Sequence, residues 1–422
     1  MAGADSTTLA QPFLPSRDEA CCADGRDWYL VLCLGGLQET AKAVVERQIA
    51  ASGCQADVKI FEEDIHGGAQ ALADGVHNGH GGCGKLFLAT DAPPSVLRGL
   101  RGVQGLFSLL AHARSLDIVL PAKPATDSTP LNSASIPADS SDASEAAAPA
   151  AAPEERSPAE AALGRLESLV TDTPLWAEAI VLWKRFRVFD TEEAEPPSAA
   201  SREGDNKQRS REREKRAEAG DALDVEIDVK KLKFRASVVR DGNHPFISVD
   251  ASPRLGGAVW QVNQGWTVDL KEYDVEVVTF ILERSVVVGL ALGDDRSKHS
   301  SNGRVPKESK GFIESGKKMS SLRPSTAYLM LVLAAPTTGD VIVDCMCGVG
   351  TIPFLGTGWF PDVFFAGGEI DAEALGHVKQ NALFLRRAHA EPPGAVGAAA
   401  CAWDAQSLPF RDGTVDAMVV DM

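Results

Sequence analysis

The segment DVIVDCMCGVGTIPF, residues 340–354, decides the fold of the C-terminal part of this 422-residue chain. An apolar run ends at the carboxylate of Asp344, and two cysteines and the glycine turn GVGT, residues 348–351, lead into a second apolar stretch. This order predicts a strand, a tight turn and a helix. Gly348 and Gly350 would let the backbone approach a ligand closely, which raises the question of what that ligand is.

Two common nucleotide-binding motifs do not fit this turn. A dinucleotide fold needs a third glycine for close packing of the helix, and this chain has Pro353 there. A P-loop needs Gly-Lys followed by Ser or Thr, which the turn lacks. What remains is a strand that ends in an acid and leads into a glycine turn.

Three further acids follow strand-like segments in the same way. Glu369 lies near the end of VFFAGGEI, Asp404 follows a third candidate strand, and Asp421 ends a fourth, in DGTVDAMVVD. Ligands of open α/β sheets bind at the carboxyl ends of the strands, so we expect these acids and Asp344 to share one site. Asp344 is placed to balance an ammonium or sulfonium group and Glu369 to accept ribose hydroxyls, which suits S-adenosylmethionine (SAM).

Composition divides the rest of the chain. Residues 121–160 and 193–221 are too poor in large apolar residues to form a core, so we expect a disordered linker and a disordered insertion. Residues 1–27 are expected to be a flexible tail, and residues 293–320 a polar linker. Three structured blocks remain, at residues 28–120, 161–292 and 321–422.

The first two blocks mix strand-like and helix-like segments. In the first, WYLVLCL and KLFLAT indicate strands, and LQETAKAVVERQIA and SVLRGLRGVQGLFSLLAHA indicate helices, which is typical of a small α+β domain. In the second, LESLVTDTPLWAEAIVLWKRF and GGAVWQVNQ are helix-like and KFRASVVR is strand-like. The run YDVEVVTFILERSVVVGLAL predicts a hairpin that turns near Glu283 and Arg284.

The charge of the chain is unevenly distributed. The net charge of −17 argues at first against a nucleic-acid partner. Between residues 222 and 325, however, 16 Lys and Arg stand against 14 Asp and Glu, and basic clusters occur at residues 230–235 and 304–323. Binding of RNA needs only a local basic patch, although solvated surfaces and linkers explain such clusters more often.

Neither a membrane span nor a metal centre is expected. No apolar run approaches the roughly 20 residues that cross a bilayer, and the N-terminus lacks the plan of a signal peptide, so we expect an intracellular protein of the nucleus or cytoplasm. The eight scattered cysteines indicate reduced thiols. His77, His80 and Cys83 have a ligand-like spacing, but without a fourth ligand they indicate a flexible loop.

Several motifs together resemble those of the THUMP-domain N2-guanosine RNA methyltransferases: LRPSTAY, DCMCGVGT, GGEID, WDAQSLPF and VVDM. Residues 161–292 are similar to the THUMP domain of that family, and residues 28–120 fit its N-terminal ferredoxin-like part. The resemblance implies an α/β and α+β multidomain protein in which these domains precede a class I, Rossmann-like methyltransferase domain. Two branches of the family, acting on tRNA and on U6 spliceosomal RNA, are similar to the chain, and GWFPDVFFAGGEIDAEAL looks more like the U6 branch.

The same resemblance implies a SAM-dependent RNA guanosine N2-methyltransferase and assigns roles to residues. Asp421 would be the catalytic acid that accepts hydrogen bonds from the guanine amine. Lys317, Lys318 and Arg323 would contact structured RNA, and a small zinc-containing activator subunit would be a partner. Cys345 departs from the family, which usually has proline there. The residues implied to hold SAM are Asp344, Cys347, Gly348, Gly350, Thr351, Glu369 and Asp404.

The chain stops at Met422, inside the catalytic motif that begins at Asp421. We therefore expect a methyltransferase domain that is incomplete at its C-terminus, so that this chain binds RNA but transfers no methyl group. The alternative is a non-catalytic THUMP-type RNA-binding module with a degenerate enzyme domain, and such a module would not bind SAM.

Overall fold

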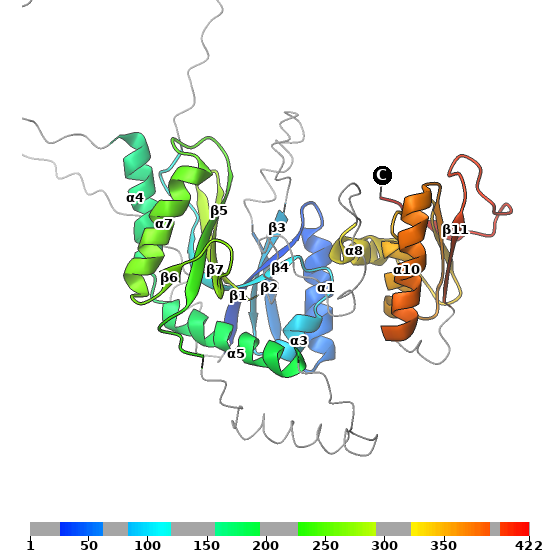
Figure 1. Cartoon of the computed structure of the whole chain (residues 1–422), viewed down its shortest axis with the longest axis horizontal. Helices are drawn as coiled ribbons and strands as arrows, with labels where there is room; N and C mark the ends of the chain where they lie inside the picture. Colours follow the sequence, from blue (N-terminus) through cyan, green and yellow to red (C-terminus); the bar gives the residue numbers. More distant parts are fainter. Residues whose placement is uncertain are drawn as a thin grey trace, which may run out of the picture.

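The computed structural model describes residues 26–61, 83–119, 157–194, 227–292, 322–388 and 397–421. They form an eight-stranded sheet with its helices and a four-stranded sheet with its own helices (Figure 1). Helix α8 (Pro324–Ala334) lies between these two parts in the figure. No helix within the ranges given above is long and apolar enough to cross a membrane.

The larger sheet has the strand order β2-β3-β1-β4-β8-β7-β5-β6. Because β4 pairs antiparallel with β8, the first two predicted blocks share one continuous sheet. The boundaries of the expected ferredoxin-like and THUMP domains therefore stay predictions. The strands are β1 (Asp27–Leu34), β2 (Ala56–Ile60), β3 (Cys83–Thr90), β4 (Gly105–Ala113), β5 (Lys233–Asp241), β6 (Thr267–Val268), β7 (Val275–Leu282) and β8 (Ser285–Ala291).

One prediction for this sheet is wrong. The segment SVLRGLRGVQGLFSLLAHA was expected to be helical, but it forms the short helix α3 (Pro94–Gly99) and then strand β4. Every residue of β4 is buried, and a strand buried on both faces has a continuous apolar sequence that periodicity does not distinguish from a helix. The predicted hairpin is confirmed, because β7 and β8 are joined by Glu283 and Arg284, with Glu283 at a φ of 51°.

Four longer helices pack on the larger sheet: α1 (Gln38–Ala51), α4 (Pro158–Thr171), α5 (Trp176–Ala194) and α7 (Ser248–Val262). In α1 the buried residues recur every three or four positions, as on the apolar side of an amphipathic helix. They are Ala41, Val44, Val45 and Ile49. These side chains belong to one large core that also includes residues of α8 and of the smaller sheet.

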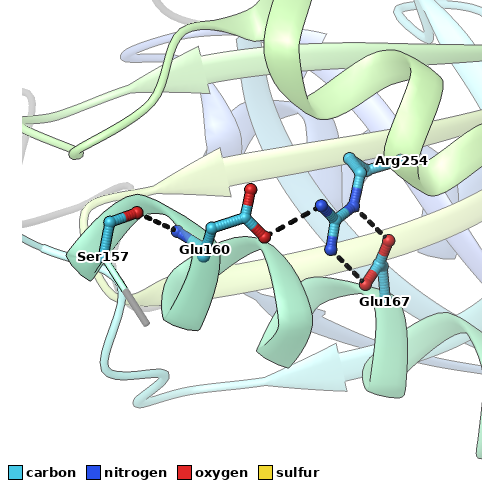
Figure 2. Close-up of polar contacts among 4 residues, drawn as sticks. All are labelled: Ser157, Glu160, Glu167 and Arg254. Carbon is cyan, nitrogen blue, oxygen red and sulfur yellow. Dashed lines mark hydrogen bonds and ion pairs between the residues drawn. The ribbon is translucent and has the colours of Figure 1, made fainter. Parts of the chain in front are cut away.

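An exposed ionic cluster joins α4 to α7 (Figure 2). The guanidinium of Arg254 on α7 donates two hydrogen bonds to the carboxylate of Glu167 and one, of 3.0 Å, to Glu160. Ser157 caps the start of α4 by accepting a hydrogen bond from the backbone N–H of Glu160 at 3.2 Å. Because these side chains are partly in water, the ion pairs orient the two helices and add little stability.

A second ion pair, between α3 and α5, is much less exposed. Arg98 donates from two nitrogens to the carboxylate of Asp190, and only 13% and 9% of the two side chains are exposed. The Arg98 guanidinium also lies 4.7 Å from the ring centre of Phe186. This ion pair therefore holds together two segments that were predicted separately. Breaking it would cost a large free energy, because both side chains are largely buried.

The smaller sheet confirms the strand, turn and helix predicted from residues 340–354. Its strands β9 (Val341–Asp344), β10 (Phe364–Glu369), β11 (Ala398–Ala402) and β12 (Ala417–Met418) are all parallel, in the order β11-β10-β9-β12. Helix α9 (Thr351–Trp359) follows the glycine turn and α10 (Ala372–Ala388) follows β10. This order, with strand-helix-strand connections, is that of a Rossmann-like α/β sheet.

Strand β12 is shorter than the sequence predicts. It was expected to end at Asp421, but its pairing with β9 covers Ala417 and Met418, with one further hydrogen bond of 2.9 Å from Val419 N–H to the carbonyl of Val343. In the described sheet β12 pairs with β9, so strand β12 ends where its hydrogen bonds with β9 end. Asp421 therefore lies beyond the strand and not at its last position.

Helix α8 connects the smaller sheet to the larger one. Leu329 packs on Gly102, where an added Cβ would lie 2.8 Å from a Leu329 methyl carbon. The guanidinium of Arg101 lies 5.7 Å from the ring centre of Tyr328. The Tyr328 ring also contacts Trp359 of α9 edge-on, with ring centres 5.2 Å apart. The two sheets are thus joined by a packed helix within the same core.

Candidate functional site

The predicted acids gather at one edge of the smaller sheet. The four strands are parallel, so their carboxyl ends all lie at this edge. Asp344 is the last residue of β9 and Glu369 the last of β10, while Asp404 and Asp421 follow β11 and β12. The negative charges of Asp421 and Glu369 both interact electrostatically with the carboxyl group of Asp344. The register of the sheet therefore brings together acids that are 77 residues apart in the sequence.

Asp344 is the most perturbed acid of this edge. Its carboxylate is buried and accepts one hydrogen bond, of 3.2 Å, from the N–H of Met346. Burial raises the pKa of Asp344 to about 7, and the charges of Asp421 and Glu369 also act to raise it. No cationic side chain of the described residues contributes to this balance. A buried carboxyl group without a cation is a place where a positively charged ligand would be stabilised.

Glu369 is held in place by backbone N–H groups. Its two oxygens accept hydrogen bonds from Gly348 at 2.9 Å, from Ile370 at 2.8 Å and from Asp371 at 2.9 Å. A carboxylate has about four acceptor positions, so one position is left for a ligand hydroxyl. The bond from Gly348 also ties the end of β10 to the glycine turn after β9.

The two glycines of the turn have different roles. Gly348 has a φ of +54°, and a Cβ there would meet no atom within 4 Å, so the turn leaves open space beside it. Gly350 has a φ of +86°, and a Cβ there would lie 2.5 Å from the ring of Phe354. The first glycine therefore leaves room for a ligand, and the second permits the backbone to enter α9.

Cys347 supports the turn and is not a nucleophile. It is buried, and its N–H donates to the carbonyl of Gly368 at 2.9 Å. Burial, assisted by the charges of Asp344 and Glu369, raises the pKa of the Cys347 thiol to about 12. The group therefore stays a protonated thiol at neutral pH. Thr351, the first residue of α9, is also buried.

Two residues of this edge were assigned no role from the sequence. Trp403 donates from its indole nitrogen to the carbonyl of Cys345 at 3.1 Å. Asn381 of α10 is fully buried and donates to the carbonyl of Val349 in the turn at 2.9 Å. Trp403 is the first residue of the motif WDAQSLPF, but its residue type alone did not indicate a role. Nothing in the sequence around Asn381 marks it.

Parts of the chain are similar to known methyltransferases. The family described as UPF0020, RMKL-like methyltransferase domain, matches residues 315–422. Human tRNA (guanine(6)-N(2))-methyltransferase THUMP3 is 33% identical over 210 residues, which cover 49% of this chain and 39% of that protein. Mouse U6 snRNA (guanine-N(2))-methyltransferase THUMPD2 is 31% identical over 160 residues, covering 37% of this chain and 27% of that protein.

The chain is similar to these THUMP3/THUMPD2-like guanine-N2 RNA methyltransferases. It spans about two-fifths of the length of human THUMP3. The alignment with THUMP3 is longer than the methyltransferase match, so it extends into the part that precedes this domain. The methyltransferase match covers the smaller, parallel sheet of this α/β structure. The crystal structure of TrmN from Thermus thermophilus is also similar, at 18% identity and a TM-score of 0.46 over 90% of this chain and 74% of that one.

The remaining predicted residues are exposed or fall outside the described residues. Asp404 is exposed, and its carboxylate accepts a hydrogen bond from the N–H of Gln406 at 2.9 Å. Asp421 is exposed, as is Arg323, which directly precedes α8. Lys317 and Lys318 fall outside the described residues, as do the histidines of the cluster at residues 77–83. No group of three metal-ligating side chains occurs in the described part of the chain.

Proposed function

We propose that this chain is a SAM-dependent methyltransferase that modifies the N2 atom of guanosine in structured RNA. The observation that carries the proposal is the buried carboxyl group of Asp344, without a cationic partner in the described part of the chain, beside an open glycine turn. A methyl donor that carries a sulfonium and an ammonium group supplies the missing positive charge. The proposed reaction, methylation of guanine N2, is the one for which the similar proteins THUMP3 and THUMPD2 are named.

The residues of the sheet edge fit such a donor. SAM supplies a methyl group that its positive sulfur makes ready for transfer. Asp344 would balance the positive charge, and Glu369 has one acceptor position for a ribose hydroxyl. Gly348 leaves space for close approach of the ligand. Cys347, Gly350, Thr351 and Asp404 would form the rest of the SAM-binding site.

Asp421 is proposed as the catalytic acid. The exocyclic amine of guanine is a poor nucleophile, because its lone pair is delocalised into the ring. A carboxylate that accepts hydrogen bonds from this amine would stabilise the charge that develops on nitrogen in the transition state. Asp421 is exposed to an incoming base and close enough to Asp344 for their charges to interact.

The RNA is proposed to be tRNA in the first instance. The sequence resemblance alone suggested the U6 branch, but similarity extends over 210 residues of the tRNA-modifying relative and 160 residues of the U6-modifying one. The THUMP-containing region would bind the RNA, and Arg323, Lys317 and Lys318 would contact it. Transfer to U6 RNA and not to tRNA would reverse this choice.

The partner is proposed to be the small zinc-containing activator subunit. Strand β11 supports this idea, because it is an edge strand of the smaller sheet and most of its small side chains are exposed. Unpaired edges of this kind promote aggregation unless another strand covers them. Co-expression with the activator should increase the soluble yield of the chain, and a charged residue in place of the exposed Ala399 should cancel that increase. Equal yields with and without the activator would count against the partnership.

The proposed activity is tested by transfer of an isotope-labelled methyl group from SAM to small RNA, followed by mass spectrometry of the nucleosides. We expect the label in N2-methylguanosine, and we expect Asp421→Ala to abolish transfer while SAM still binds. The comparisons do not support the inactivity expected from the sequence, and this assay measures it directly. Binding of SAM without transfer would support inactivity, whereas binding of RNA without SAM would favour the non-catalytic module.

A further inference from the structure

Trp403 crosses the ends of three strands at the proposed SAM site. It directly follows β11, and its backbone N–H donates to the carbonyl of Glu369, the last residue of β10, at 3.3 Å. Its indole N–H donates to the carbonyl of Cys345, the residue after β9, at 3.1 Å. One residue after β11 therefore makes polar contacts at the ends of β10 and β9.

The indole ring lies directly over Gly368. A Cβ added to Gly368 would lie 1.5 Å from Cε2 of Trp403, so the ring occupies the space of the missing side chain. The ring also contacts Phe410 edge-on, with ring centres 5.3 Å apart. The contacts with Gly368 and Phe410 restrict the orientation of the indole, whose N–H donates to the carbonyl of Cys345.

Three ligand-holding groups depend on the backbone that Trp403 fixes. Cys345 directly follows Asp344, Asp404 directly follows Trp403, and Glu369 follows Gly368. The carbonyl of Gly368 also accepts the N–H of Cys347, which continues into the glycine turn. A shift of the indole would therefore change the relative positions of all three acids.

We propose that Trp403 is a positioning residue that sets the spacing of Asp344, Glu369 and Asp404 for the methyl donor. The residue acts through the Cys345 carbonyl and through Gly368, and it need not touch the donor. The indole hydrogen bond restrains the turn at Cys345 from outside the turn itself. This role rests on the proposed function, because the spacing matters only if the acids share one ligand.

The first experiment needs no ligand. Amide hydrogen exchange of the full chain should show protection at Cys347 and Gly348, whose N–H groups bond across the turn to Gly368 and Glu369. Trp403→Phe keeps an aromatic ring over Gly368 but removes the indole donor. We expect it to speed exchange at these two amides about five- to tenfold, because one hydrogen bond to the turn is lost. Unchanged exchange would overturn the positioning role.

The matched control is Trp260→Phe. Trp260 lies on α7, far along the chain, and is 53% exposed, so the same chemical change is made without touching the smaller sheet. It should leave exchange at Cys347 and Gly348 at the wild-type rate. Equal acceleration by both variants would show a general effect on the fold and would overturn the proposal.

The second experiment measures SAM binding by calorimetry. Trp403→Phe should weaken binding about five- to tenfold, and Trp260→Phe should leave it unchanged. Gly368→Ala keeps the indole donor but displaces the ring, so it should weaken binding as well. Wild-type affinity in both site variants would overturn the proposal. If the wild-type chain binds no SAM, the proposed function fails, and the exchange experiment still decides whether Trp403 fixes the turn.

Discussion

The proton on Asp344 makes SAM binding dependent on pH in a specific direction. In the folded protein the pKa of Asp344 is about 7, whereas the ordinary pKa of an aspartate side chain is 3.8. A cation beside the carboxyl group favours the charged form, so binding of SAM should expel the proton. The affinity for SAM should therefore rise as the pH rises towards 7.

The size of the change in SAM affinity follows from the fraction of Asp344 that is ionised. With a pKa of about 7, that fraction is about 0.03 at pH 5.5 and about 0.5 at pH 7.0. If only the carboxylate binds SAM, Kd should fall roughly fifteenfold over this interval. The interval also stays below the pKa of an α-amino group, about 7.7 to 8.0, so the donor keeps its positive charge.

Calorimetry in two buffers of different ionisation enthalpy measures both the affinity and the protons released. At pH 5.5 we expect about one proton released for each SAM bound. Asp344→Asn is the matched control, because it keeps the shape of the side chain and removes its titration. It should bind SAM more weakly and with no pH dependence over this interval. A wild-type Kd that stays constant from pH 5.5 to 7.0, or that rises with pH, would refute the reasoning.

Three stability predictions follow from contacts outside the acid cluster, and each is measured by urea unfolding. Arg98→Met removes two charge-assisted hydrogen bonds to the largely buried carboxylate of Asp190 and should cost about 1.5 to 3 kcal/mol. Arg254→Met removes exposed ion pairs and should cost less than about 1 kcal/mol, and equal losses for the two variants would contradict the role given to burial. Gly350→Ala forces a side chain into a positive φ against Phe354 and should cost about 1 to 3 kcal/mol, so a neutral result would contradict the geometry of the turn.

The sequence predicted the features whose signals are local. The strand, turn and helix around residues 340–354 were predicted correctly, because a short apolar run, a glycine turn and a second apolar run determine them without distant contacts. The gathering of Asp344 and Glu369 was predicted for a related reason. Parallel strands place their carboxyl ends at one edge, whatever the details of packing.

The missed features depend on distant partners. The segment that became β4 looks helical alone, and only its position between β1 and β8 makes it a strand. The role of Trp403 depends on the register of β11 with β10, which sets Gly368 beneath the indole. Arg98 and Asp190 lie 92 residues apart, so no local pattern could reveal their ion pair.

The most direct test of the site is a crystal structure of the chain with S-adenosylhomocysteine, the product that remains after methyl transfer. We expect this ligand at the carboxyl ends of β9, β10 and β11, with its ammonium group beside Asp344 and its ribose hydroxyls on Glu369. Its density at another place, or beside these strands without contact to either acid, would contradict the assignment.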